Sequence, residues 1–411
     1  MRYKEIAERL AEHIMTHRQP GDKMPGLREF ARRERISLIT ARNVYLQLER
    51  QGLVTLRQGA GTYVATARPQ GPIDMASIRP PEAMLAWVEP YLKAGLEGLL
   101  AYDPPQGYEP LRVSAQEWLA AQGIERMPII TGGAQQALFL AGLSLLKPGD
   151  RVVVEEPGYT GARRIFESLG ATVTGMPCPR TVEDLAPLKK SGAGLFYTMP
   201  QAHIPTGASM PEEVRAALIE LAERHGFFIL EDDPLSDIVG IMPLKARDAH
   251  DRVIYVKSLS NILGPGLRMG LCVMPAELEQ RFVQLKEVND LSLSGILQRL
   301  FFEMLGSGDL ARHIARLKTE LQKRWEHIRA HGVWQGGGAC LWIDAGSPGR
   351  LHAENLKRQG IKIMPGDIYG AAWANHLRLS ILTPSREDLF KALENVRDCL
   401  GHVRPDLITL L

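Results

Sequence analysis

The sequence predicts an α/β protein with a small N-terminal domain followed by a larger domain built on a sheet covered by helices. Three observations support this fold class. Short helical patterns and two short strand patterns about a Gly-rich turn occupy residues 3 to 64. Four prolines and one glycine then interrupt residues 65 to 81, and strand-like and helix-like segments alternate from Met84 onward. We therefore predict domains at residues 1–66 and 83–411, joined by a linker at residues 67–82.

Composition excludes several classes of protein. The 411 residues are 45% apolar and 23% charged, which is ordinary for a globular protein of two or three domains. No stretch approaches the roughly 20 apolar residues of a membrane-spanning helix, and the N-terminus lacks the apolar run of a signal peptide. The four cysteines, Cys178, Cys272, Cys340 and Cys399, form no C-x-x-C pair. We expect a cytoplasmic protein with packed, reduced thiols, no membrane partner and no metal site.

Charge is distributed unevenly along the chain. Residues 1 to 68 carry 13 Lys and Arg against 7 Asp and Glu, whereas the remaining residues carry 36 against 40. A basic domain joined to a mildly acidic one suggests that the basic domain binds a polyanion. A solvated helical surface gives the same count, so charge alone leaves both interpretations open.

The N-terminal domain has the element order of a winged helix-turn-helix. Ile6, Leu10 and Ile14 have helical spacing within residues 3–16, and further helices are expected at residues 27–33 and 40–51. Residues 53–64 predict two short strands about a Gly-rich turn. In such a domain the helix at residues 40–51 would enter a DNA major groove.

This domain resembles the GntR family of DNA-binding regulators over nearly all of residues 3 to 64. The resemblance rests on PGDKMP at residues 20–25, LREFA at 27–31, GLV at 52–54 and GAGT at 59–62. It implies double-stranded operator DNA as a partner. Leu38 follows Ser37 where relatives often carry an arginine, so base reading at that position is in doubt. The candidate DNA contacts, each of which is by itself also a typical surface residue, are Arg28, Ser37, Thr40, Arg42, Asn43, Arg57, Gln58 and Gly59.

The larger domain alternates strands and helices in the manner of a sheet with helices on both faces. Strands are expected at residues 129–130, 151–154, 195–198, 227–230 and 253–256. Amphipathic helices include residues 135–146 and 211–225.

Residues from about 102 to 382 resemble the fold-type I aminotransferases, which use pyridoxal phosphate (PLP). A GntR domain fused to such a body defines the MocR subfamily of transcription regulators. In VIYVKSLSNILGPGLRMG at residues 253–270, Ser258, Ser260 and Arg268 match the serines and arginine around the family's cofactor lysine, and Asn261 stands at the lysine position. An amide nitrogen forms no Schiff base because its lone pair is delocalised into the carbonyl. The resemblance therefore implies a PLP-shaped site without its catalyst and no covalent cofactor.

The resemblance also assigns other pocket residues. Gly133, Ala134 and Gln135 open a helix where the family holds the cofactor phosphate, although Ala134 lacks the usual hydroxyl. Tyr159 matches the aromatic residue that stacks on the cofactor ring. Asp232 matches the carboxylate that pairs with the pyridine nitrogen.

Four further positions bear on the ligand and the assembly. Ile204 and Leu235 stand where polar residues usually bind the cofactor's phenolic oxygen, so we expect them to make the pocket apolar. Arg378 matches the arginine that grips the substrate carboxylate, although a lone arginine in a strand is otherwise usually a surface or ion-pair residue. We expect a small carboxylate-containing effector with an apolar or aromatic body. Tyr102 is expected to reach the partner's phosphate site in a homodimer.

Three functions remain open on the sequence. The first is a DNA-binding regulator, not an enzyme, whose body is a ligand sensor or a pure dimerisation scaffold. The second is a PLP-dependent aminotransferase with a DNA-binding appendage, which would need Lys257, four residues before Asn261, as its amine. The third is a regulator that binds PLP or a PLP–amino acid adduct noncovalently. The first is favoured because Ile204 and Leu235 have changed together with Asn261.

Overall fold

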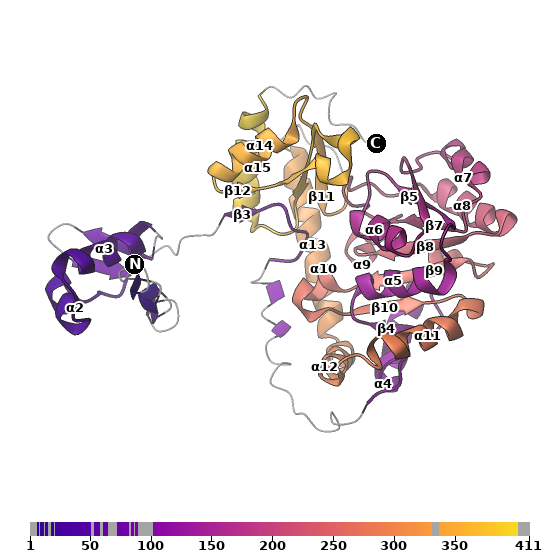
Figure 1. Ribbon diagram of the computed structural model, residues 1–411, viewed down its shortest axis with the longest axis horizontal. Helices are drawn as coiled ribbons and strands as arrows, with labels where there is room; N and C mark the ends of the chain where they lie inside the picture. Colours follow the sequence, from indigo (N-terminus) through magenta and orange to yellow (C-terminus); the bar gives the residue numbers. More distant parts are fainter. Residues whose placement is uncertain are drawn as a thin grey trace. The chain divides into compact units, whose positions relative to one another are not determined.

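The computed structural model divides the chain into two compact units, Met1–Pro72 and Ile73–Leu411 (Figure 1). It describes residues 6–401 except 8, 12, 15–17, 20, 51–52, 58–60, 65–71, 82–83, 86, 89–101 and 331–336. Each unit has its own hydrophobic core.

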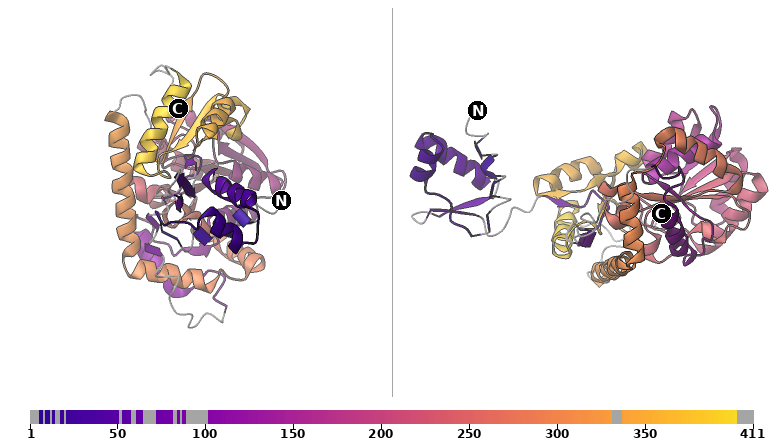
Figure 2. Two further views of the ribbon diagram at one scale, coloured as in Figure 1. Left: turned by 90° about the vertical axis from the view of Figure 1, so that its left-hand side faces the viewer. Right: turned by 90° about the horizontal axis from the view of Figure 1, so that it is seen from below.

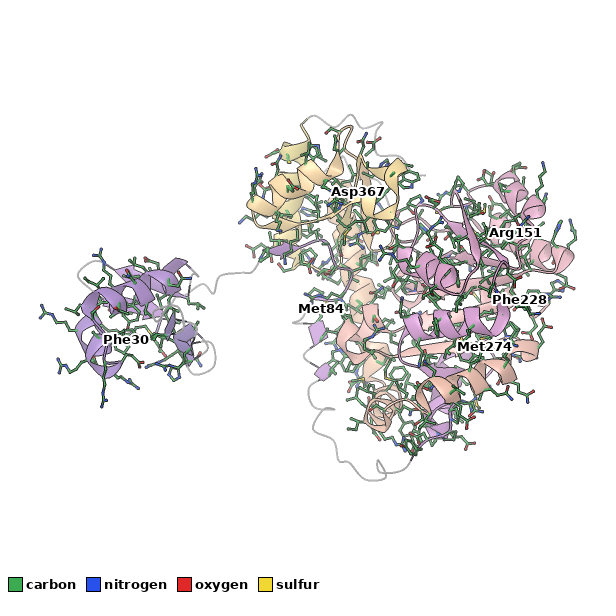
Figure 3. All side chains as sticks on the ribbon, in the orientation of Figure 1. Phe30, Met84, Arg151, Phe228, Met274 and Asp367 are labelled. Carbon is green, nitrogen blue, oxygen red and sulfur yellow. The ribbon has the colours of Figure 1, made fainter. Side chains whose placement is uncertain are left out.

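The first unit packs helices against a β-hairpin. Its elements include α2 (Leu27–Arg33), α3 (Leu38–Arg50), β1 (Val54–Arg57) and β2 (Gly61–Val64). Phe30 of α2, labelled in Figure 3, stacks on Tyr45 of α3 with ring centroids 4.9 Å apart. Ala41, Val44 and Leu48 are also fully buried, so one face of α3 faces the core at helical spacing. The predicted order of helices and hairpin is confirmed, with the recognition helix beginning at Leu38.

The second unit is built on a sheet that has seven strands within the described residues, in the order β4-β10-β9-β8-β7-β5-β6. The strands are β4 (Ile129–Thr131), β5 (Arg151–Glu155), β6 (Thr172–Met176), β7 (Leu195–Thr198), β8 (Phe228–Asp233), β9 (Val253–Ser258) and β10 (Gly270–Val273). Strands β5 to β9 run parallel to one another, whereas β10 is antiparallel to both β4 and β9. The five strands predicted from the sequence are present. Two strands were not predicted: β6, which lies at the edge beside β5, and β10, which lies between β4 and β9.

Helices cover both faces of this sheet. Along β5, Val152 and Val154 pack in one core cluster with Leu138 of α5, whereas Val153 packs in another with Leu218 of α8. This burial on both faces explains why the strands read as nearly continuous apolar runs. The helices are α4 (Glu109–Ala120), α5 (Ala134–Leu145), α6 (Thr160–Ser168), α7 (Ala186–Ser191), α8 (Glu212–His225), α9 (Ser236–Val239), α10 (Ser260–Leu263), α11 (Ala276–Asp290) and α12 (Gly295–Gly306). None of the helices in the described part of the chain has the length and apolar character that a membrane span requires.

A second, antiparallel sheet lies in the C-terminal part. It joins β11 (Cys340–Asp344), β14 (His376–Ser380) and β13 (Met364–Pro365), and α14 (Gly349–Arg358) and α15 (Arg386–Leu400) belong to the same region. The long helix α13 (Asp309–Ala330) runs beside this region in Figure 2. Leu341 and Leu377 of the sheet share a core cluster with Leu321 of α13. Trp342 and Arg378 are paired across β11 and β14.

Residues 73–81, which the sequence places in the linker, belong to the second unit. Strand β3 (Ile73–Asp74) pairs in parallel with β12 (Ile361–Lys362). Met75 is fully buried, and its carbonyl oxygen accepts a hydrogen bond of 2.7 Å from the backbone N–H of Ser380. Backbone pairing and the burial of Met75 hold this segment although its sequence shows no alternation.

Candidate ligand pocket and DNA-binding surface

The start of α3 is exposed on the side opposite the core. The backbone N–H of Thr40 donates to Ser37 Oγ at 3.0 Å, so Ser37 caps the helix. Arg42 and Asn43 are exposed one turn into the helix. Leu38 and Ile39 are 52% and 74% exposed, and this apolar pair was not among the contacts inferred from the sequence.

Exposed cations lie on and beside the helices of the first unit. Arg28 on α2 and Arg42 on α3 are both exposed, and neither forms an ion pair with another described residue. Lys23, a further residue that the sequence analysis missed, forms a β-bridge with Tyr63 of β2, and its Nζ lies 5.7 Å from the centroid of that ring. The side chain of Arg57, with Gln58 and Gly59, lies outside the described residues.

In the second unit, a cavity of about 210 Å³ opens at the carboxyl ends of the sheet strands. Open α/β sheets bind ligands at this edge. The lining contains eight of the eleven pocket residues inferred from the sequence, together with Met199, Ile204 and Pro234. Those eight are Ala134, Gln135, Tyr159, Asp232, Ser258, Ser260, Asn261 and Arg268.

One corner of the cavity is suited to an anion. Helix α5 begins at Ala134 without a side-chain cap, so its first backbone N–H groups remain unpaired at a positive helix end. Nearby, the Arg268 guanidinium donates to Ser260 Oγ at 3.4 Å. Gly133 has φ of 89°, and a Cβ there would lie 2.8 Å from Arg268 Nη2. Glycine at this position therefore lets the guanidinium approach the helix start.

A buried carboxylate forms another part of the cavity wall. Burial raises the pKa of Asp232 to about 7, although a hydrogen bond of 2.7 Å from the Tyr197 hydroxyl opposes the increase. No cation pairs with Asp232 within the described part of the chain. Near neutral pH this group can therefore either accept or donate a hydrogen bond to a ligand. Beside it, the Tyr159 hydroxyl donates to Gln135 Oε1 at 2.7 Å.

None of the described residues that line the cavity carries an amine for a Schiff base. Asn261 lines it, and its amide makes no hydrogen bond to another described residue. Lys257 precedes Ser258 on β9, and neighbouring side chains of a strand point to opposite faces of the sheet. Ser258 lines the cavity, so Lys257 points away from it.

Lys257 is held in a buried polar cluster. Its Nζ lies 3.0 Å from Asp233 Oδ2 and 2.8 Å from Ser236 Oγ, and it also pairs with Asp237. Burial alone would lower the pKa of Lys257, but the two carboxylates outweigh burial and raise it. A protonated ammonium group has no lone pair for attack. The residues present therefore do not fit a covalently bound PLP.

Leu235 does not line the cavity, and the expectation that it would is wrong. It is fully buried in the core with Ile238 and Tyr255. The backbone N–H groups of Leu235 and Ser236 both donate to Asp233 Oδ1, and this turn carries the chain into α9. The apolar part of the cavity wall comes from Met199, Ile204 and Ala134 instead.

Arg378 lies outside this cavity on an aromatic face of the C-terminal sheet. Trp342, paired with Arg378 across the strands, stacks on His376 with centroids 5.0 Å apart and contacts Tyr369 and Trp373 edge-on. Arg378 is 5% exposed, its Nε is buried without a partner, and it makes no hydrogen bond or ion pair with any described residue. A buried guanidinium without a partner is costly unless an anion binds it.

The two sites adjoin through one loop. Cys340 Sγ, on the strand that carries Trp342, lies 3.1 Å from the carbonyl oxygen of Pro205. Pro205 follows Ile204, which lines the cavity. Tyr102 does not line the cavity in a single chain and is 83% exposed.

Sequence comparison divides the chain in the same way. Residues 74–396 match the aminotransferase class I and II family, and residues 2–64 match the bacterial regulatory proteins of the gntR family. The HTH-type transcriptional regulator TauR of Rhodobacter capsulatus is 30% identical, with 89% of this chain and 88% of that protein covered. The uncharacterized HTH-type transcriptional regulator YdfD of Bacillus subtilis is 31% identical over 71% of this chain, and the chain spans 65% of YdfD.

Solved structures match the larger unit. Kynurenine aminotransferase of Pyrococcus horikoshii superimposes with a TM-score of 0.73 at 25% identity, with 81% of this chain and 91% of that one covered. The fold-type I fold inferred from the sequence is thereby confirmed.

Proposed function

Because the chain belongs to the aminotransferase class I and II family and carries a GntR-type DNA-binding domain, we propose that it is a MocR-type regulator that senses a small acid and does not catalyse transamination. The observation that supports this proposal is the missing amine. Asn261, which by the sequence resemblance stands at the lysine position, lines the cavity. Lys257 forms ion pairs with Asp233 and Asp237 on the opposite face of the sheet.

The effector in this proposal is a carboxylate with an apolar or aromatic body. Arg378 supplies a buried cation without a partner, and Trp342 and His376 supply flat apolar surface beside it. The unpaired start of α5 and Arg268 offer a second position for an anion. The polar wall at Asp232 can bind a hydroxyl or amine of such a ligand.

The protein acts as a cytoplasmic homodimer in this proposal. Related folds place their sites near a two-fold interface, and Tyr102 is exposed enough to reach a partner subunit. The DNA-binding domain reads operator DNA with Arg28 and Arg42 on phosphates, while Ser37, Thr40 and Asn43 lie at the helix start that enters the groove. Leu38 and Ile39 are placed to contact thymine methyl groups.

Noncovalent PLP is the second candidate ligand, because Arg268, Ser258, Ser260 and Asp232 all line the cavity. Under this alternative the purified protein releases intact PLP on dialysis. Mass spectrometry of small molecules released from the purified protein separates the two candidates.

The first test concerns covalent capture. Full-length protein incubated with PLP and then borohydride is expected to gain no pyridoxyl group, because no free amine faces the cavity. Peptide mass spectrometry checks this result. The Asn261→Lys variant is expected to capture PLP only weakly, because Ile204 leaves the phenolic oxygen without a polar partner. A pyridoxyl group on Lys257 of the parent protein would contradict the proposal.

A second test concerns DNA. A duplex is first selected by the protein from random sequence, and its affinity is then measured by fluorescence anisotropy at several salt concentrations. Arg28→Ala and Arg42→Ala are each expected to weaken binding and to reduce the salt slope by about one unit for each lost phosphate contact.

Two controls distinguish the kinds of contact. Ile39→Ala is expected to weaken binding without changing the salt slope, because it removes an apolar base contact and no charge. Lys189→Ala removes an exposed cation from α7 of the larger unit and should change neither quantity. Unchanged slopes in both arginine variants would mean that this surface does not bind the DNA backbone.

A further inference from the structure

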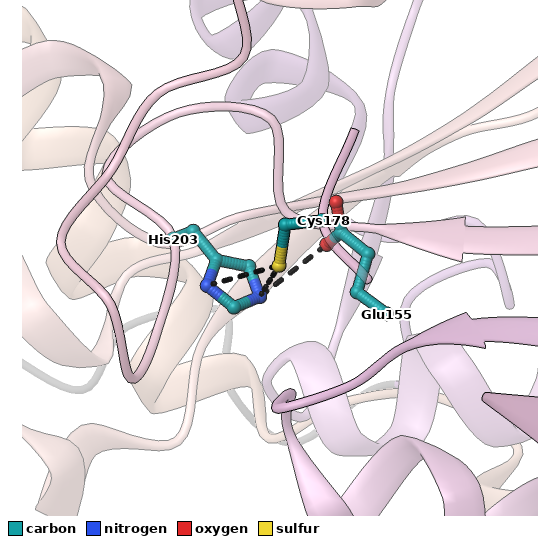
Figure 4. Close-up of side chains that lie close together, drawn as sticks. All are labelled: Glu155, Cys178 and His203. Carbon is teal, nitrogen blue, oxygen red and sulfur yellow. Dashed lines mark hydrogen bonds and ion pairs between the residues drawn. The ribbon is translucent and has the colours of Figure 1, made fainter. Parts of the chain in front are cut away.

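Three side chains from separate strand ends converge behind the cavity (Figure 4). Glu155 ends β5, Cys178 follows β6, and His203 lies in the loop after β7. His203 Nε2 lies 3.4 Å from Cys178 Sγ and 3.4 Å from Glu155 Oε2. The three potential ligand atoms all lie within 4.8 Å of one another, and among the described residues no other group of this kind is found.

These separations agree with a tetrahedral metal site. Zinc bond lengths of about 2.3 Å to sulfur and about 2.0–2.2 Å to nitrogen and oxygen imply ligand separations of about 3.6 Å for N···S and about 3.4 Å for N···O. Cys178 Sγ also lies 3.7 Å from His203 Nδ1, so a metal in the ring plane requires a rotation of the thiol.

A nucleophilic triad does not explain the arrangement. In a triad the nucleophile and the carboxylate occupy opposite nitrogens of the histidine ring. Here the thiol and the carboxylate both approach Nε2. The other nitrogen, Nδ1, lies 2.9 Å from Thr206 Oγ1. When Nδ1–H donates to that hydroxyl, Nε2 keeps its lone pair for a metal, as in a metal-binding histidine, and the Glu155 carboxylate lies 3.4 Å from this nitrogen.

The carboxylate is oriented in the same manner. Glu155 Oε1 accepts a hydrogen bond of 2.8 Å from the Thr198 hydroxyl, and Oε2 accepts one of 2.8 Å from the backbone N–H of Met199. Groups outside the cluster therefore fix two of the three ligands before any metal binds. Such outer partners orient metal ligands in proteins.

The electrostatics of the cluster favour a divalent cation. A dication with one thiolate and one carboxylate has no net charge, which removes the cost of burying either anion alone.

We propose that Glu155, Cys178 and His203 bind one zinc ion, with a water molecule as the fourth ligand. The site joins the ends of β5, β6 and β7 and fixes the loop whose Met199 and Ile204 line the cavity. The proposal differs from the sequence-based expectation of no metal site, because the three residues are far apart in the sequence and meet only at the sheet edge. The proposal does not depend on DNA binding or on the effector.

Cobalt titration of the full-length protein tests this site. Protein stripped with a chelator is expected to bind one equivalent of Co²⁺ with a thiolate-to-cobalt charge-transfer band, which Zn²⁺ then displaces. Cys178→Ser is expected to lose the band and to bind at least about 100-fold more weakly. Cys399→Ser is the matched control. Cys399 lies 3.7 Å from His352 Nδ1 but belongs to no three-ligand group within the described residues, so this variant should keep the band.

A second variant keeps all three ligands, so a loss of cobalt binding in it cannot be explained by the loss of a ligand or by unfolding. Thr206→Val removes the outer partner of His203 and one weak hydrogen bond of 3.3 Å from the Ala208 N–H. It should lower cobalt affinity by about 10-fold or more while the circular dichroism spectrum stays unchanged. The proposal fails if the parent protein shows no thiolate band, if Cys178→Ser retains it, or if Thr206→Val binds cobalt as tightly as the parent.

Discussion

Arg378→Met is expected to abolish the response of DNA binding to a carboxylate effector while leaving ligand-free DNA binding intact. The variant removes the buried cation without a partner, so effector affinity should fall by about 30-fold or more. The effector is an acid identified among molecules released from the purified protein, and anisotropy of labelled DNA with and without it gives the response. If the response persists in Arg378→Met, Arg378 does not mediate effector sensing, and the larger unit is better explained as a scaffold.

The free energy of unfolding distinguishes an effector-binding role of Arg378 from a structural role. Arg324 is equally buried but donates to the carbonyl oxygens of Ile381, Leu382 and Pro384, at 2.7 to 3.0 Å, and to Glu320. Arg324→Met should therefore lower the free energy of unfolding by about 3 kcal/mol or more. Arg378→Met breaks no such bond and should leave stability unchanged or raise it. Urea denaturation of both variants provides the comparison, and an equal loss in the two would show that Arg378 is structural.

Lys257→Met is expected to destabilise the fold by about 3–5 kcal/mol, because it leaves Asp233 and Asp237 buried without their cation. Lys286→Met is the matched control. Lys286 is also fully buried, but its partner Asp290 is 22% exposed and can be hydrated when the cation is removed. Its loss in urea denaturation should be clearly smaller. Equal losses would mean that burial of the lysine stem, and not its charge, stabilises the sheet.

The pH dependence of the Lys257 effect follows from the pKa shifts. Burial alone would raise the pKa of Asp233, but Lys257 and hydrogen bonds from Ser236 and Tyr255 outweigh burial and lower it. A lowered carboxyl pKa stabilises the fold at pH values above the ordinary carboxyl pKa. This stabilisation is lost as the pH falls through the lowered pKa. The raised pKa of Lys257 stabilises the fold at pH values below the ordinary lysine pKa. This stabilisation is lost as the pH rises through the raised pKa.

The ion pair therefore stabilises the protein from about pH 4 to about pH 10. Without Lys257 the carboxyl groups take up protons at higher pH, because burial then acts alone. We expect the deficit of Lys257→Met to be largest near neutral pH and smaller near pH 4. A deficit that does not vary with pH would contradict the assigned charges.

Local sequence was sufficient to predict the strands of the larger sheet and many of the residues that line the cavity. The strands of the larger sheet are short apolar runs buried on both faces, and such runs are recognisable without tertiary information. Ser258 and Asn261 follow directly from one of these runs, so their place at the carboxyl edge was predictable. Alternation along β9 also indicates that Lys257 faces away from Ser258.

Tertiary contacts decided the positions that sequence reasoning missed or misplaced. Leu235 is directed into the core by a turn that Asp233 holds, and no periodic pattern reports such a turn. Met75 is held by β14, more than 300 residues away along the chain. Glu155, Cys178 and His203 meet only because three parallel strands end side by side. Ile39 carried a usable signal, since an apolar residue beside the helix cap lies off the buried face of α3.

The attachment of Met75 has a mechanical consequence. Its carbonyl oxygen is bonded to the N–H of Ser380, and Ser380 lies two residues beyond Arg378 on β14. The stretch that leads from the DNA-binding domain is thus clamped to the strand that carries the buried guanidinium. A sideways slip of β14 pulls on residues 73–75 without passing through a helix or a loop. Under the proposed function, β14 and one hydrogen bond therefore connect the acid-binding Arg378 to residues 73–75.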